Sequence, residues 1–184
     1  SVNLHPGEYR LWMLLADVLT AQDRRSEAID AYRKAVELEP QDPVLLNNLA
    51  FTLLELDREL PLALELAKKS VDLQPGYVFN QDTLAWALHK NGRSNEALEI
   101  MLQIRESVAT PTAEIEFHNA VICQNMDLLD APRAVFERIA ARPDATAVPG
   151  LKRQIEAVLA KLPVQAECAG QASSTAAPAG AEGR

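Results

Sequence analysis

The chain has 184 residues, of which 48% are hydrophobic and 24% are charged, as in ordinary water-soluble globular proteins. Its formal net charge of -8 disfavours DNA or RNA as a partner, because an acidic protein repels a polyanion on average. Charged residues interrupt every apolar stretch before it reaches the roughly 20 residues that a membrane helix needs, so direct membrane insertion is not expected.

The sequence repeats with a period of 34 or 35 residues. Pro6, Pro40 and Pro75 lie 34 and then 35 residues apart, each after an apolar run. The same step separates small and apolar residues at Leu15, Leu49 and Leu84, at Ala16, Ala50 and Ala85, and at Ala28, Ala63 and Ala97. So many positions sharing one period indicate stacked supersecondary units. Residues 1–8 are then expected to be the end of a preceding, truncated repeat.

The first complete unit spans residues 9–42 and is predicted to be a helical hairpin. Apolar residues at helical spacing form one stripe at Trp12, Leu15, Ala16 and Leu19 and a second stripe at Ala28, Tyr32, Ala35 and Val36. The polar turn between the stripes ends in Ser26, whose hydroxyl is a candidate N-cap for the second helix.

Two further hairpins are predicted at residues 43–77 and 78–112. The earlier of the two keeps the apolar pattern with one extra residue in its turn. In the later one, Gly92 fits the end of a helix and Ser94 fits the cap of the next, although the closing proline is missing.

Beyond residue 112, the sequence departs increasingly from the repeat pattern. Residues 113–146 are predicted to form a degenerate fourth unit, in which Pro132 replaces the usual alanine near the start of a helix. Residues 147–163 form an amphipathic pattern that would cap the exposed end of the stack. Residues 164–184 are almost all Ala, Gly, Ser, Pro and Gln, so a disordered tail is expected there.

These features resemble the tetratricopeptide repeat (TPR), whose signature is W-x2-L-G-x2-Y, then A-x3-F, then P. The first unit offers Trp12-x2-Leu15-Ala16-x2-Leu19, then Ala28-x3-Tyr32, then Pro40. The resemblance implies an all-α fold, a right-handed α-solenoid of stacked antiparallel helix hairpins with a C-terminal capping helix. Solenoids of this kind curve into a trough, which the resemblance implies is lined by the first helix of each hairpin.

The resemblance also implies which residues line that trough. They are Met13, Asp17, Asn47, Asn48, Phe51, Phe79, Asp82, Trp86, His89, Phe117, Val121 and Gln124. Only 5% of the chain is aromatic, yet four aromatic residues fall in this set, which is typical of anchors for a partner's side chains. The alternative is that these rings fill gaps between the first helices.

One known TPR mode, a clamp for the C-terminal carboxylate of a chaperone peptide, is disfavoured. Of the clamp positions, only Asn48 matches, while the others hold Met13, Asp17, Phe79 and Thr83. Asp17 and Asp82 would repel an anionic terminus. A protein or peptide partner with apolar anchors and some Lys or Arg suits the predicted trough better.

No catalytic, metal or cofactor site is expected. His5, His89 and His118 lie in different units, and none has a partner at i+4 with which to form a metal pair on one helix face. No Gly-rich phosphate loop or nucleophile elbow occurs, and the acidic residues are spread over solvent-facing positions. The chain is therefore expected to be non-catalytic.

Units two to four also resemble the C-terminal repeats of large bacterial TPR proteins, among them proteins that accompany exopolysaccharide export and exosortase systems. Two functions follow. The first is a scaffold that binds a partner peptide or domain in the concave trough. The second is a structural segment of a longer array, which contacts neighbouring repeats or a second copy of itself through the exposed N-terminal end.

Overall fold

The computed structural model describes residues 7–148 and 150–163, and its elements in this part of the chain are all helical. They are α1 Glu8–Ala21, α2 Arg25–Leu38, α3 Pro43–Glu55, α4 Leu60–Leu73, α5 Val78–Lys90, α6 Ser94–Ser107, α7 Ala113–Asn125, α8 Pro132–Ala140, the 3-10 helix η1 Pro143–Thr146 and α9 Leu151–Leu159. The all-helical fold predicted from the sequence is confirmed. The predictions for Pro6, His5 and the tail at 164–184 lie outside the described residues.

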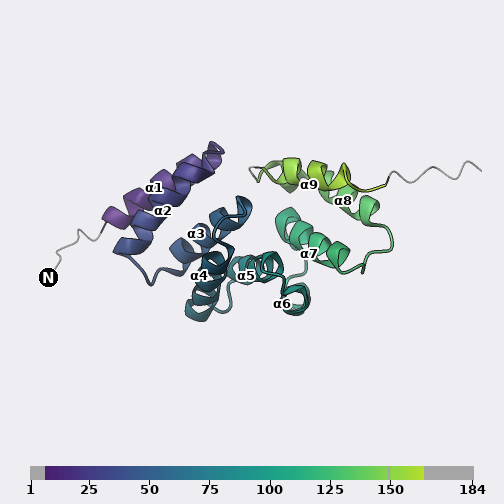
Figure 1. The fold of residues 1–184 in the computed structure, drawn as a ribbon, viewed down its shortest axis with the longest axis horizontal. Helices are drawn as coiled ribbons and strands as arrows, with labels where there is room; N and C mark the ends of the chain where they lie inside the picture. Colours follow the sequence, from purple (N-terminus) through teal and green to yellow (C-terminus); the bar gives the residue numbers. More distant parts are fainter. Residues whose placement is uncertain (1–6, 149, 164–184) are drawn as a thin grey trace, which may run out of the picture.

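Helices adjacent in sequence pack as antiparallel pairs, and the pairs stack into an arc that forms a TPR-like solenoid. Figure 1 shows α3, α5 and α7 along the inner side of the arc and α4 and α6 on its outer side. Apart from Glu8, the first residue of α1, the helix pairs fall within the ranges 9–42, 43–77, 78–112 and 113–146. The division of the chain into repeat units at those boundaries stays a prediction.

The same turn closes the first helix of every pair. Asp23, Asp57, Gly92 and Asp127 each have a positive φ, between 50° and 78°. One residue further along, an N–H donates to a carbonyl five residues earlier, as in Arg24 to Leu19 at 2.8 Å and Arg93 to Leu88 at 2.9 Å. This left-handed residue and its bond make up a Schellman motif, which satisfies carbonyls left free at a helix end.

Two helix starts differ from the sequence prediction. Arg24 and Arg93 occupy the N-cap positions of α2 and α6, and neither Ser26 nor Ser94 caps its helix. The early turn is instead stabilised by Arg24, whose Nε donates to Glu27 at 2.7 Å. Because the Schellman turn delivers the chain directly into the next helix, each serine already lies inside the first turn.

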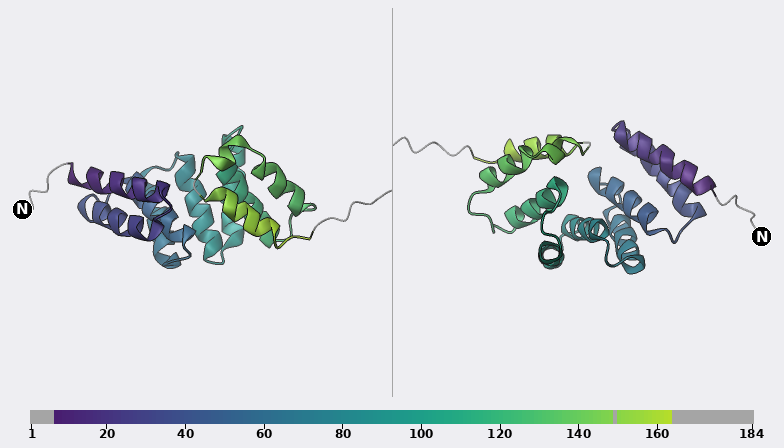
Figure 2. Two further views of the ribbon diagram at one scale, coloured as in Figure 1. Left: turned by 90° about the horizontal axis from the view of Figure 1, so that it is seen from above. Right: turned by 180° about the vertical axis from the view of Figure 1, so that it is seen from behind.

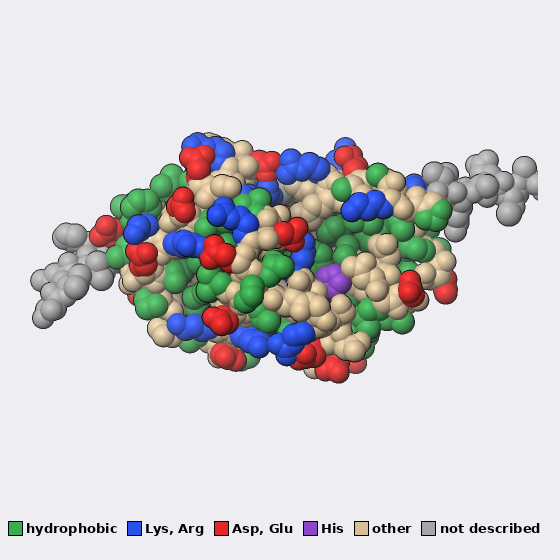
Figure 3. Space-filling model, viewed as in Figure 1, with side chains coloured by type: hydrophobic (Ala, Val, Ile, Leu, Met, Phe, Trp, Pro, Cys, Tyr) green, Lys and Arg blue, Asp and Glu red, His purple; other side chains and the backbone are tan. Residues whose placement is uncertain are grey.

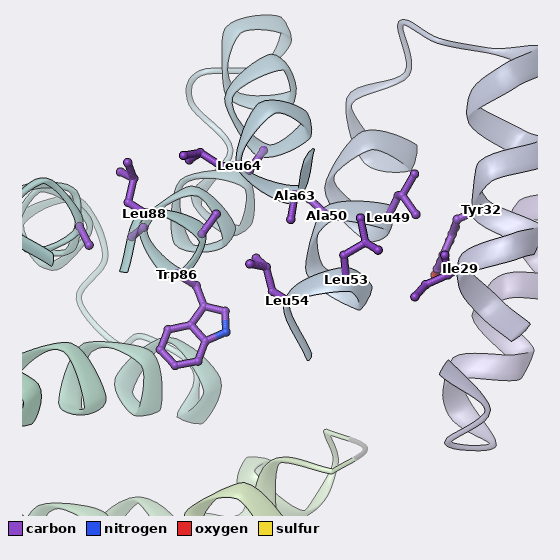
Figure 4. Close-up of a cluster of buried hydrophobic side chains, with 14 of the residues drawn as sticks. Ile29, Tyr32, Leu49, Ala50, Leu53, Leu54, Ala63, Leu64, Trp86 and Leu88 are labelled. Carbon is purple, nitrogen blue, oxygen red and sulfur yellow. The ribbon is translucent and has the colours of Figure 1, made fainter. Parts of the chain in front are cut away.

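Small residues allow the helices to approach closely. Ala16, Ala50 and Ala85, which share the repeat period, are all 0% exposed in one continuous core that runs through the first three pairs (Figure 4). A second cluster contains Phe117, Phe136 and Ile155, and joins α7, α8 and α9. The amphipathic helix predicted near residues 147–163 is α9, which buries Leu151 and Ile155.

The arc curls so that the start of α9 faces the turn between α1 and α2, as the right view of Figure 2 shows. Arg153 Nη2 lies 3.0 Å from Asp23 Oδ2, and the amide of Gln154 donates to the Glu55 carboxylate. Gly150 precedes α9 with a φ of +87°, and a Cβ at this position would lie 2.9 Å from the Arg25 guanidinium. The left-handed backbone at this position favours glycine, and a larger residue would also displace the end of the Arg25 side chain.

Candidate binding trough

The twelve predicted trough residues come from the first helices of the pairs, but they differ widely in exposure. Asp17 and Phe79 are exposed, Asp82, Trp86 and Phe117 are buried, and the others are half-buried. In the space-filling view, acidic and basic side chains border the middle of the molecule, where a histidine side chain is visible (Figure 3). The described trough is therefore not one uniform aromatic surface.

Several of the predicted residues meet around a single hollow of about 280 Å³ between α3, α5 and α7. These are Asn47, Asn48, Phe51, Phe79 and Asp82, and the lining is completed by Val44, Tyr77, Asn80, Thr83 and Glu114. Phe79, 38% exposed, and Tyr77 stand at its edge with ring centroids 5.4 Å apart. We call this space the α3–α5–α7 hollow.

Two amide oxygens near the hollow have no hydrogen-bond partner among the described residues. They are Oδ1 of Asn47 and Oδ1 of Asn80. Asn80 is 0% exposed, and its Nδ2 donates to the carbonyl of Ser70 at 3.3 Å, which fixes the orientation of the amide. Buried polar atoms are nearly always paired, so unpaired acceptors on the lining of a hollow are unusual.

A cluster of titratable groups adjoins the hollow. His118 Nδ1 lies 2.9 Å from Asp82 Oδ2, and the carboxylate raises the pKa of this buried histidine even though burial alone would lower it. Burial raises the pKa of Glu114 to about 7, and the neighbouring carboxylates of Asp82 and Glu55 add to the rise. The cluster is therefore acidic, and one carboxyl of it titrates near neutral pH.

Trp86 and Phe117 correct the expectation of exposed anchors. Trp86 is 5% exposed, and its ring stacks on His118 with centroids 4.5 Å apart and on His89 at 5.4 Å. Phe117 is 3% exposed and packs edge-on to Phe136 at 6.0 Å. Both rings lie where α5, α7 and the C-terminal helices meet, and they pack between these helices.

The C-terminal helix lies next to the second half of the predicted trough. A space of about 290 Å³ is lined jointly by α9 residues, among them Gln154 and Val158, and by Trp86, Phe117 and Val121. Lys90 lies beside it, with its Nζ 4.9 Å from the Trp86 ring centroid and 2.6 Å from Asp57 Oδ1. The part of the trough away from α9 is therefore the α3–α5–α7 hollow.

The remaining predicted residues lie outside the hollow. The Asp17 carboxylate accepts a hydrogen bond of 2.6 Å from the Tyr32 hydroxyl, and Met13 packs on the main core. His89 Nδ1 lies 3.0 Å from Ser94 Oγ. Gln124 is half-buried near the end of α7. None of these four lines the hollow.

Sequence reasoning missed Asn80, Glu114, His118 and Tyr77 as neighbours of the hollow. One signal was present for Asn80: it stands 35 residues after Leu45, which is a buried position of the repeat. A polar residue at a position that packs elsewhere in the same array is a recognisable departure. Glu114 and His118 come from the degenerate unit, where the pattern is weakest.

An exposed apolar stripe lies on α1, away from the hollow. Leu11, Leu14, Leu15 and Val18 are 69%, 60%, 45% and 45% exposed. They recur at helical spacing on one face of α1. At the positions 34 residues later on α3, Leu45 and Leu49 are 0% and 3% exposed. The stripe is therefore exposed on α1, whereas the equivalent positions of α3 are buried.

No group of three or more His, Cys, Asp or Glu side chains in the described part of the chain is arranged to hold a metal ion. Among the helices that the structure describes, none is long and apolar enough to cross a membrane.

Comparison with known proteins agrees with this fold. Residues 10–52 match the family model of the tetratricopeptide repeat. Human tetratricopeptide repeat protein 21A is 28% identical over 120 residues, which cover 62% of this chain and 9% of that protein. The chain therefore spans less than a tenth of the length of this relative.

Solved TPR structures superpose over most of the chain. TTC0263, a thermophilic TPR protein of Thermus thermophilus, gives a TM-score of 0.64 at 20% identity and covers 82% of each chain. A TPR protein from Parabacteroides merdae gives 0.60 at 16% identity, over 87% of this chain and 62% of the other. The first TPR domain of Spaghetti (RPAP3), bound to the HSP90 peptide SRMEEVD, gives 0.59 at 20% identity, over 69% and 99%. These likenesses show a TPR-like solenoid fold, and residues 10–52 are similar to a tetratricopeptide repeat.

Proposed function

We propose that this chain is a non-catalytic scaffold that holds a segment of another protein in the α3–α5–α7 hollow and the trough around it. The observation that carries the proposal is the lining of the hollow, where Phe51 and Phe79 stand beside buried amide oxygens that lack partners among the described residues. Concave sites that combine apolar walls with a few polar groups are typical of binding sites. TPR-repeat proteins are typically non-catalytic.

The chemistry of the partner is proposed from the charges in the trough. The RPAP3 domain binds a peptide that ends in acidic residues, as its sequence SRMEEVD shows. In this chain, Asp82 and Glu114 border the hollow, so an acidic segment would be repelled. We therefore propose a partner with apolar anchors and basic residues.

A photo-cross-linking experiment tests the proposal. A photoreactive phenylalanine analogue replaces Phe79 at the edge of the hollow, and the full-length protein is irradiated in its native cells. The control carries the same analogue at Leu102, which is 46% exposed on the outer helix α6. Cross-linked segments are then sequenced by mass spectrometry.

The scaffold account predicts that one protein segment is cross-linked from position 79 and is absent at position 102. The same segment must also bind the purified chain in solution. Equal capture from both positions, or no capture from position 79, would contradict binding in the trough.

A second function is favoured by the apolar stripe on α1. We propose as the alternative that the chain is a structural segment of a longer array, which docks a neighbouring repeat or a second copy of itself on Leu11, Leu14, Leu15 and Val18. Exposed apolar patches of this kind mark interaction surfaces. The resemblance to bacterial arrays, including proteins of exopolysaccharide export and exosortase systems, belongs to this alternative.

A further inference from the structure

The geometry of the α3–α5–α7 hollow points to a receptor for the cationic side chain of a lysine or an arginine in the bound segment. The inference rests on the proposed function and names the chemical group that the trough recognises. Three independent features of the hollow support it: unpaired acceptors, an uncompensated carboxylate and an aromatic edge.

The first feature is the pair of amide oxygens that lack donors among the described residues. Asn80 is completely buried, and its Nδ2 already donates to Ser70, so the unpaired atom is an acceptor. Asn47 contributes a second unpaired acceptor from α3. An ammonium or guanidinium group carries only donors, three or five of them, and so matches acceptors of this kind.

The second feature is the charge balance of the adjoining cluster. Asp82, Glu55 and Glu114 supply three carboxyl groups, whereas His118 and Arg25 supply the cations. His118 pairs with Asp82 at 2.9 Å, and Arg25 lies 3.8 Å from Glu55. Glu114 interacts with these charges at longer range, and its carboxylate makes no direct ion pair within residues 7–148 and 150–163. A cation in the hollow would supply a counter-charge in direct contact.

The third feature is the aromatic edge formed by Phe51, Phe79 and Tyr77. The faces of such rings attract cations, and their apolar area suits the methylene stem of a lysine or arginine. The chain already contains one such contact in the same trough, where Lys90 lies over Trp86. A neutral side chain would gain neither the attraction between cation and ring face nor an ion pair with the carboxylate, and an acidic one would be repelled by it.

The test compares two peptides of nearly equal shape and different charge. N-acetyl-Leu-Arg-Leu-amide and its citrulline counterpart are titrated into the 15N-labelled chain, and the side-chain amide resonances of Asn47 and Asn80 are followed by NMR. Citrulline keeps the planar hydrogen-bonding group of arginine but carries no charge. The lysine peptide is included as a second cation.

We expect saturable shifts of both amide resonances with the arginine and lysine peptides, and an affinity at least about ten-fold weaker for the citrulline peptide. Glu114→Gln should weaken binding of the arginine peptide about ten-fold. Glu99→Gln, an equal charge change at an exposed position of α6, should leave it unchanged. Dispersed NMR spectra of both variants verify that they are folded.

The pH dependence of the unmodified chain gives a second measurement that needs no variant. Glu114 faces Asp82 and His118 within the cluster, and Glu55 and Arg25 beyond them. Burial raises the pKa of Glu114 to about 7, so lowering the pH from about 8 to about 6 protonates this carboxyl. The affinity of the chain for the arginine peptide should therefore fall. The citrulline peptide should show no such loss.

Equal affinities for the arginine and citrulline peptides would overturn the cation inference and leave binding of segments in the trough intact. Absence of saturable shifts with either cationic peptide, or an equal effect of Glu99→Gln and Glu114→Gln, would also overturn it. Failure of the scaffold function itself is recognised separately, by the absence of a cross-linked segment at position 79.

Discussion

His118 and Asp82 form a buried pair that joins two neighbouring helix pairs. The imidazole Nδ1 lies 2.9 Å from one carboxylate oxygen and 3.1 Å from the other, and the two residues are 1% and 3% exposed. His118 belongs to α7 and Asp82 to α5, so the pair fixes the α5–α7 spacing that the hollow depends on. The two side chains pair with almost no exposed surface, and the pairing offsets much of the cost of burying them.

Trp86 stacks on His118, so we expect it to contribute to stability. Trp86→Ala should lower the free energy of unfolding by about 3–5 kcal/mol, as large-to-small changes in cores do. Phe79→Ala, at an exposed position, should cost about 1 kcal/mol or less. Urea denaturation followed by circular dichroism measures both. Equal losses in the two variants would contradict the buried position of Trp86.

Glu114 should make stability depend on pH. Its pKa is raised to about 7 in the folded chain, so the folded state binds the proton more tightly than the unfolded state. The stabilisation is present below the ordinary carboxyl pKa and is lost as the pH rises through about 7. We expect the free energy of unfolding to fall by about 2 kcal/mol between about pH 5 and about pH 8 from this group.

The matched variants for this prediction are Glu114→Gln and Glu99→Gln. The raised pKa of His118 acts in the same direction as that of Glu114, and the lowered pKa of His89 acts in the opposite direction. Comparison with Glu99→Gln removes the His89 contribution. Glu114→Gln also takes away one cause of the raised His118 pKa, and this change flattens the profile in the same direction. Glu114→Gln should flatten the pH profile, whereas a profile as steep as that of Glu99→Gln would show that Glu114 is not the titrating group.

The contact between α9 and the first helix pairs should respond to salt. The Arg153–Asp23 pair is exposed, so it adds about 1 kcal/mol at most and is screened at high ionic strength. Spin labels at Ser26 and Lys152, with Cys123 and Cys168 changed to serine, report the distance between α2 and α9. We expect a narrow distribution at low salt.

Removal of both α9 contacts by Arg153→Ala and Gln154→Ala should broaden that distribution. Lys161→Ala, at an exposed position beyond α9, is the control and should leave the distribution narrow. An unchanged distribution in the double variant would mean that packing within the second core, and not these polar contacts, sets the position of α9.

The α1 stripe gives a prediction for self-association. If a second copy docks there, sedimentation should show a mass that rises with concentration, and Leu14→Lys should abolish the rise because it places a charge in the interface. Leu102→Lys, at a similarly exposed position on α6, should have no effect. A monomer at all concentrations would exclude docking of a second copy on this face.

The fold was predictable because its signal is periodic. Alanines at 16, 50 and 85 keep the repeat step, and each is fully buried where helices meet. Exposure within the trough was less predictable. Trp86 and Phe117 carry the residue types of binding anchors, and only the curl that brings α7, α8 and α9 together decides that they are buried.

The repeat period of the sequence also could not predict which residues line and adjoin the hollow. Asp82 was expected in the trough, but its partner His118 is 36 residues away on the degenerate unit, and pairing across units depends on how closely the helices stack. Glu114 looks like an ordinary solvent-facing carboxyl in the sequence. Its raised pKa arises only from neighbours that the fold assembles.

The most direct test of the scaffold account is the affinity of the segment that cross-links to position 79. Calorimetry should measure this affinity for the unmodified chain, for Phe79→Ala and for Leu102→Ala. The account predicts at least about ten-fold weaker binding, or about 1.4 kcal/mol, for Phe79→Ala and no change for Leu102→Ala. Equal affinity of all three proteins would contradict binding in the trough.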